Sequence, residues 1–175
     1  MTIASEYISI CIKNMQDMKL QAEKAIAQLT DEQLHYQLDS ESNSIVIIIK
    51  HLRGNMLSRW TDFYTTDGEK PNRHRDTEFI DDIKTKQQLF EIWEEGWRIL
   101  FDVVLNLKEE DLLRQITIRQ QPHSVINAVN RQIAHYSHHI GQIVFLAKHL
   151  AGANWKTLSI PRGKSEDYLH KPPTT

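Results

Sequence analysis

Two histidines one helical turn apart, His135 and His139, are the residues whose spacing most clearly suggests chemistry. Residues at positions i and i+4 of an α-helix lie on one face with Cβ atoms about 5–6 Å apart, so two imidazoles can bind one cation. A third histidine, His51, lies far upstream on another segment with a helical pattern. Three histidine ligands leave coordination positions open, which is typical of a catalytic rather than a structural metal site.

The residues between the paired histidines exclude one common metal-dependent chemistry. The segment is His135-Tyr-Ser-His-His139, without the glutamate that follows the first histidine in the metalloprotease motif. The chemistry would therefore depend on the ion itself, which can lower the pKa of bound water to about 7 or hold a thiol as a thiolate.

Each of the three histidines comes one residue before a member of the apolar stripe of its own segment. One residue corresponds to about 100° around a helix, so each imidazole is expected at the edge of the buried face. If the two helices adjoin along these edges, the three imidazoles meet at an end or in a side cleft of the fold, where helical bundles commonly build metal sites.

Four segments have the periodicity of amphipathic helices, with apolar residues alternately three and four positions apart. They cover about residues 5–29, 44–65, 83–107 and 124–150, and Gly96 inside the third is expected at a point of close packing. Residues 67–76 form the longest polar interruption and predict a loop, while residues 115–119 alternate like a short extended piece. The expected fold class is all-α: a four-helix bundle with unequal loops and an irregular C-terminal tail.

Composition and charge limit the function classes. The chain has 175 residues, 40% hydrophobic and 25% charged, which suits one globular domain. A formal net charge of −2 argues against a nucleic-acid partner, which requires a basic face. The single cysteine, Cys11, excludes an internal disulfide and a cysteine-rich zinc motif, and its place on an apolar stripe predicts burial. Without a membrane-spanning run or a secretory signal, we expect a soluble, cytoplasmic protein with no membrane partner.

The order of these motifs resembles the DinB/YfiT superfamily of metal-binding four-helix bundles. A histidine near the start of the second helix is followed by a His-x-x-x-His pair in the fourth helix and then by Gly141-Gln142. Residues 50–62, 67–71 and 159–163 look like its branch of small Bacillus-type proteins. The resemblance covers nearly the whole chain, so residues 1–175 are expected to form a single DinB-like domain, with the bundle at about 5–150 and the tail at 151–175.

The resemblance implies that His51, His135 and His139 bind one divalent ion, nickel or zinc or another first-row metal. It implies a metal-dependent enzyme acting on a small-molecule substrate, with thiol S-transfer from a low-molecular-weight thiol such as bacillithiol as the leading function. The alternatives are a metal-dependent hydrolase and a non-catalytic, dimeric metal-binding module of the stress response. A homodimer is also implied.

Polar residues near the expected site are candidates for binding substrate. These residues are Asn55, Arg59, Asp62, Gln142 and Arg162. The alternative for those on the second helix is a solvated rim of the bundle. For the tail, Trp155 and Ile160 suggest that its first part folds back against the helices, over the site, with Arg162 as an anion contact.

Overall fold

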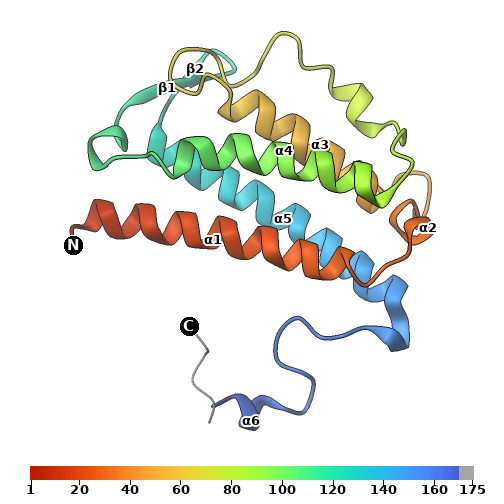
Figure 1. Ribbon diagram of the computed structural model, residues 1–175. Helices are drawn as coiled ribbons and strands as arrows, with labels where there is room; N and C mark the ends of the chain where they lie inside the picture. Colours follow the sequence, from red (N-terminus) through yellow and green to blue (C-terminus); the bar gives the residue numbers. More distant parts are fainter. Residues whose placement is uncertain (170–175) are drawn as a thin grey trace.

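In the computed structural model, which describes residues 1–169, the chain is mostly helical (Figure 1). Four long helices lie side by side: α1 (Ile3–Ile26), α3 (Ile45–Trp60), α4 (Lys86–Val104) and α5 (Val125–Ala151). The short elements are α2 (Asp31–Leu34), η1 (Arg75–Phe79), η2 (Glu109–Asp111), β1 (Gln115–Ile118), β2 (Gln121–Ser124), η3 (Gly152–Asn154) and α6 (Ser165–Leu169). The expected predominance of helix is thus confirmed.

Hydroxyl side chains determine where the long helices begin. In each case the side chain before the helix accepts a hydrogen bond from the backbone N–H three residues later, which satisfies a donor that has no partner within the helix. These capping residues are Thr2, Ser44, Thr85 and Ser124. The cap at Thr85 explains why α4 begins at Lys86, three residues later than the apolar pattern predicted.

The core lies between two helix pairs, α3 with α4 and α1 with α5, and α3 also contacts α5. Its largest buried side chains include Trp60, Trp97 and Tyr136, and Cys11 is buried as predicted. The α3–α4 contact is close at Gly96, where an added Cβ would lie 3.0 Å from the sulfur of Met56. The expectation of close packing at this glycine is therefore confirmed.

Helix α3 ends at Trp60 rather than near residue 65, because the chain turns back on the helix. Thr61 is extended and Asp62 adopts a left-handed conformation with φ of 49°. The side chains of Ser58 and Arg59 both donate hydrogen bonds to the carbonyl oxygen of Gly68. The loop that follows is therefore fixed to the last turn of α3.

The expected extended piece is one strand of a hairpin. Strand β1 pairs antiparallel with β2, a strand that the sequence pattern did not predict. Arg119 and Gln120 form the turn with φ of 52° and 61°. The carboxylate of Asp67 accepts hydrogen bonds from both of their backbone N–H groups, at 2.8 and 2.7 Å, and so stabilises a turn with unfavourable φ angles.

The first part of the tail packs against the helices, as predicted. Trp155 and Leu158 contact the core, and Gln28 exchanges two hydrogen bonds with the backbone of Lys156. Beyond this point the tail runs along the α1 side of the molecule, away from η1 (Figure 1). Residues 170–175 of the predicted tail lie outside the described residues.

None of the helices in residues 1–169 is both long enough and apolar enough to cross a membrane.

Candidate metal centre

The three predicted histidines meet where α3 faces α5. The ring centroid of His51 lies 5.4 Å from that of His135 and 5.0 Å from that of His139, and the two α5 rings are 4.7 Å apart. One nitrogen from each ring lies within 4.8 Å of the other two. The three side chains therefore lie close enough together to hold one metal ion, as predicted.

The separation of two of these nitrogens fits a tetrahedral ion. Imidazole nitrogens bind zinc at about 2.0–2.1 Å, which places two ligands of a tetrahedral ion about 3.3–3.4 Å apart. His51 Nε2 and His135 Nε2 are 3.4 Å apart. Two of the three ligand atoms are thus already spaced as one ion would require.

The two histidines of α5 are also in the protonation state that favours metal binding. Burial and the neighbouring His139 and His51 lower the pKa of His135 to about 3. Burial lowers the pKa of His139 as well. Both imidazoles are therefore neutral at pH 7 and keep a nitrogen lone pair, which is the form that binds metals.

Two side chains orient the imidazoles from outside. Glu78 Oε2 lies 2.9 Å from His51 Nδ1, and Gln142 Oε1 lies 2.8 Å from His139 Nδ1. A hydrogen bond from Nδ1–H leaves the lone pair on Nε2, which in His51 is the atom that faces His135. The structure therefore places Gln142, a predicted substrate contact, against His139, one of the three clustered histidines.

Glu78 is the residue of this centre that sequence reasoning missed. It lies on η1, in a polar stretch without an apolar helical pattern, so no periodic pattern marks it. Its carboxylate also accepts two hydrogen bonds from Arg73, at 2.7 and 2.9 Å, and both side chains are less than 10% exposed. Burial raises the pKa of Glu78, but the hydrogen bonds from His51 and Arg73 outweigh this and lower it, so the group is an anion at neutral pH.

Glu78 reaches His51 across the backbone of α3 at Gly54. A Cβ added to Gly54 would lie 2.6 Å from Glu78 Cδ, a distance that only displacement of the carboxylate can relieve. Glycine within a helix costs about 1 kcal/mol relative to alanine. The glycine therefore provides space for the carboxylate that holds His51.

Replacing Gly54 by alanine is expected to displace Glu78 and weaken metal binding, by up to the roughly 10–100-fold that loss of a ligand-supporting group costs. Isothermal titration with zinc measures the change. Gly141→Ala on α5 is the matched control, because its added Cβ meets nothing within 4 Å. It is expected to bind zinc normally and to gain up to about 1 kcal/mol of stability. Equal zinc affinity in both variants would contradict the role of Gly54.

A cavity of about 360 Å³ opens beside His51 and His135. Two predicted substrate-binding residues of α3, Asn55 and Arg59, line it. The hydroxyl of Tyr136 donates to Asn55 Oδ1 at 3.2 Å and accepts from Trp60 Nε1 at 2.8 Å, which joins α3 to α5. Because its oxygen is engaged, Asn55 presents its NH₂ group as a donor.

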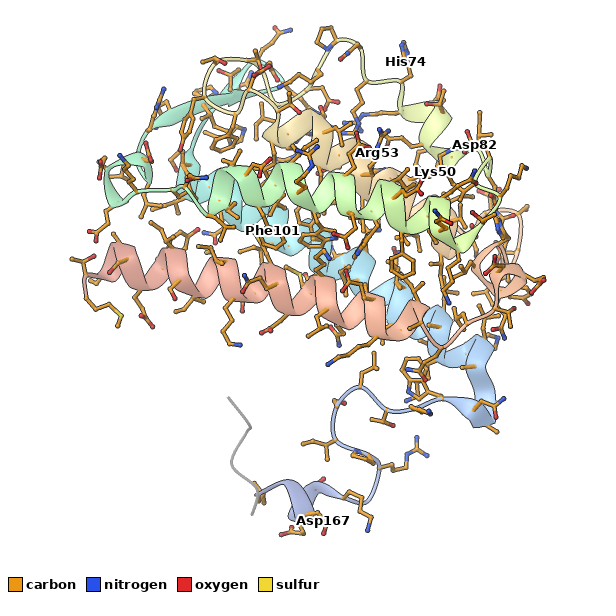
Figure 2. All side chains as sticks on the ribbon, viewed as in Figure 1. Lys50, Arg53, His74, Asp82, Phe101 and Asp167 are labelled. Atoms are coloured by element: carbon orange, nitrogen blue, oxygen red, sulfur yellow. The ribbon has the colours of Figure 1, made fainter. Side chains whose placement is uncertain are left out.

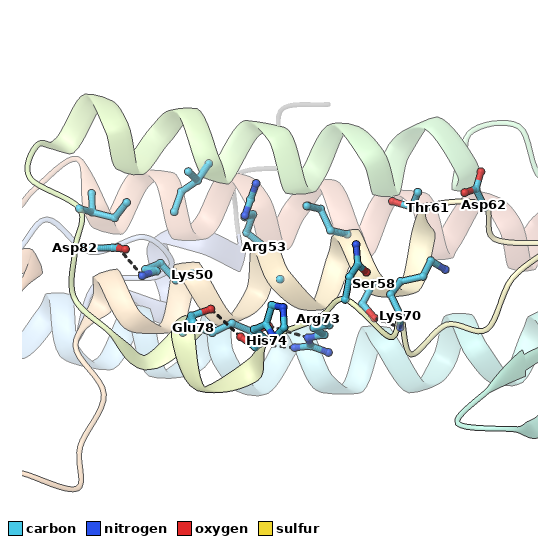
Figure 3. Close-up of a pocket in the computed structure, with 16 residues that line it drawn as sticks. Lys50, Arg53, Ser58, Thr61, Asp62, Lys70, Arg73, His74, Glu78 and Asp82 are labelled. Atoms are coloured by element: carbon cyan, nitrogen blue, oxygen red, sulfur yellow. Dashed lines mark hydrogen bonds and ion pairs between the residues drawn. The ribbon is translucent and has the colours of Figure 1, made fainter.

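Two further predicted substrate-binding residues, Asp62 and Arg162, do not line this cavity. Asp62 lines a larger cavity of about 650 Å³ between α3, α4 and the segment around η1, seen in Figure 3. Figure 3 also shows Arg73 and Glu78 in the wall of this larger cavity, and Glu78 in turn contacts His51. Arg162 lies in the exposed tail, and Figure 2 places Asp167 of the tail on the side of the helices opposite Lys50 and His74. Asp62 is displaced because α3 ends at Trp60, and Arg162 is displaced because the tail runs along another side of the helices.

Glu69 anchors the arginines around the smaller cavity. Its Oε2 lies 2.6 Å from Arg75 Nη2, 3.0 Å from Arg119 Nε and 3.1 Å from Arg59 Nη2. Burial raises the pKa of Glu69, but the hydrogen bonds from these arginines outweigh it and lower the pKa to about 2.

The lowered pKa of Glu69 predicts a loss of stability in acid. A carboxylate whose folded-state pKa is depressed stabilises the fold above its ordinary pKa of about 4.5, and this contribution is lost as the pH falls towards 2. We expect Glu69→Gln to be less stable than the natural chain by about 1–3 kcal/mol at pH 6, with the difference shrinking below pH 4. Urea unfolding at several pH values measures it, and a pH-independent difference would argue against the proposed ion pairs.

The comparisons with known proteins identify a family. A family model described as "Protein of unknown function (DUF1572)" matches residues 2–164, so the chain belongs to this family. No curated protein and no solved structure matches the chain.

Proposed function

We propose that this chain is a DinB/YfiT-like four-helix bundle whose three histidines bind one divalent ion, zinc or nickel. The observation that carries the proposal is the convergence of three imidazole nitrogens, two of them 3.4 Å apart, beside a cavity of small-molecule size. A bound ion would be held by the Nε2 atoms of His51 and His135 and by one ring nitrogen of His139. Glu78 orients the ring of His51 and Gln142 that of His139, whereas His135 Nδ1 has no hydrogen-bond partner among the described residues. Three protein ligands leave at least one coordination position for a substrate.

The proposed reaction is the transfer of a low-molecular-weight thiol, of the bacillithiol type, to a small electrophile. A divalent ion in this site would supply Lewis acidity, which favours a thiolate over a thiol. The chain itself would position the electrophile through Asn55 and Arg59, which line the cavity beside His51. The proposal also includes a homodimer, which light scattering on the purified protein tests.

The residues around the cavity support thiol transfer over hydrolysis. Hydrolysis requires a base for the attacking water, and none of the described residues that line the cavity is Asp or Glu. Glu78, the carboxylate that contacts His51, is bound by both His51 Nδ1 and Arg73. A thiol needs less help, because its ordinary pKa of about 8.5 is already close to neutral.

Incubation with bacillithiol and 1-chloro-2,4-dinitrobenzene tests the reaction. The sulfur–carbon bond forms, chloride leaves, and the thiol proton passes to solvent. We expect the zinc- or nickel-loaded chain to form the thioether faster than the metal-free chain, and His139→Ala to lose this rate. If no electrophile in a panel reacts faster with the loaded chain, the transferase is wrong and the metal-binding module stands. If the loaded chain turns over only nitrophenyl esters, a metal-dependent hydrolase replaces the transferase as the proposed function.

A further inference from the structure

Arginines from four separate parts of the chain surround the cavity beside the histidines. They come from α3, from η1 and the loop before it, from the hairpin turn and from α5. They are Arg59, Arg73, Arg75, Arg119 and Arg131. Guanidinium groups repel one another, so a cluster gathered from distant segments requires negative charge at its centre.

The protein supplies only part of that negative charge. Glu69 binds Arg59, Arg75 and Arg119 and lies 3.7 Å from Arg73 Nη1, while Glu78 binds Arg73. Two carboxylates thus face five guanidinium groups. Among residues 1–169, Arg131 has no ion pair; it is an exposed residue of α5 that lines the cavity one turn before His135.

The hydrogen bonds in the cavity wall are also incomplete. Arg59 Nε and Arg73 Nη1 are buried and have no hydrogen-bond partner among the described residues, although Arg73 Nη1 lies 3.7 Å from Glu69 Oε1. One acceptor of the same wall, Gln132 Oε1, also lacks a partner there. An unpaired buried donor costs about 1–3 kcal/mol, more when it is charged. Asn55 adds a further donor, its NH₂ group. The wall is therefore rich in donors and positive charge.

We propose that this cavity binds an oxyanion group, a carboxylate or a phosphate, on the small molecule that reaches the histidines. Arginine donates in a planar fork that matches both groups, and such charge-assisted hydrogen bonds are about twice as strong as neutral ones. The cavity volume of about 360 Å³ suits a small anionic molecule rather than a polymer. The identification of this anion as a substrate rests on the proposed function, whereas the anion site itself does not.

Titration calorimetry at constant ionic strength tests the site directly. Inorganic phosphate and malonate are the two anionic probes, which distinguish phosphate from carboxylate, and malonamide is the uncharged control. We expect the metal-free chain to bind one of the anions and not malonamide. Zinc-loaded protein is measured in parallel, so that binding by the arginines is separated from binding to the ion. Failure of both anions to bind either form would overturn the proposal.

Two variants locate the anion. Arg131→Gln and Arg119→Gln are each expected to weaken anion binding at least tenfold while zinc still binds with a stoichiometry of one. Arg98→Gln is the control, because Arg98 is an exposed residue of α4 paired with Asp102. If Arg119→Gln does not fold after losing its contact with Glu69, Arg131→Gln decides alone. Unchanged anion affinity in Arg131→Gln would overturn the site. Thiol transfer can fail without affecting these measurements, so the two proposals are tested separately.

Discussion

Replacing His135 by alanine is expected to abolish stoichiometric metal binding. Burial is the largest cause that lowers the pKa of His135 to about 3, so its ring is neutral, and its Nε2 lies 3.4 Å from His51 Nε2. Loss of a direct ligand should reduce zinc affinity by more than the roughly 10–100-fold that loss of a supporting residue costs. Zinc titration and metal analysis of the purified chain measure the change, and His51→Ala and His139→Ala should behave alike.

The same substitution should uncouple zinc from stability. A ligand that binds only the folded chain at 100 times its dissociation constant adds about 2.7 kcal/mol to the free energy of unfolding. We expect zinc to raise the melting temperature of the natural chain but not that of His135→Ala. His149→Ala, an exposed histidine in the last turn of α5, is the control and should respond to zinc normally. An equal zinc-induced rise in all variants would contradict the three-histidine site.

The second large effect is expected at Glu78. Glu78→Ala leaves the buried Arg73 guanidinium with only the longer contact to Glu69, at 3.7 Å, and removes the acceptor that orients His51. Breaking a buried ion pair costs up to about 3–5 kcal/mol. Urea unfolding of the metal-free chain and zinc titration measure the two losses. Glu110→Ala is the control, because Glu110 is exposed and has no ion pair among residues 1–169.

A double variant separates the two roles of Glu78. Replacing Arg73 and Glu78 together by methionine removes both buried charges, so we expect much of the lost stability to return. Zinc affinity should stay low, since His51 still lacks its acceptor. If zinc affinity recovers together with stability, Glu78 contributes to the centre only by maintaining the fold.

The histidine site could be predicted because helical spacing is a local property. The i, i+4 relation of His135 and His139 and the matching position of His51 follow from 3.6 residues per turn, and the structure brings the three together. Asn55 and Arg59 follow from the same phase along α3. Each lies on a regular helix, where the number of residues between two side chains determines the angle between them around the helix axis.

The parts that could not be predicted depend on irregular segments. Glu78 reaches His51 only because the loop after α3 folds back and Gly54 leaves space for it. The hairpin turn depends on hydrogen bonds that its backbone donates to the Asp67 carboxylate, more than fifty residues earlier in the chain. Asp62 was expected on the helix, but α3 ends before it. Helical and strand periodicities are local patterns, so they do not reveal such long-range contacts.

The zinc K-edge X-ray absorption spectrum of the zinc-loaded chain reports which atoms bind the ion. Coordination by the three histidines predicts three imidazole nitrogens at about 2.0–2.1 Å, with their outer-shell scattering, and one further light ligand. In His51→Ala the imidazole contribution should fall or the zinc should be lost. A spectrum without imidazole scattering, or one that is identical in His51→Ala, would contradict the three-histidine metal centre.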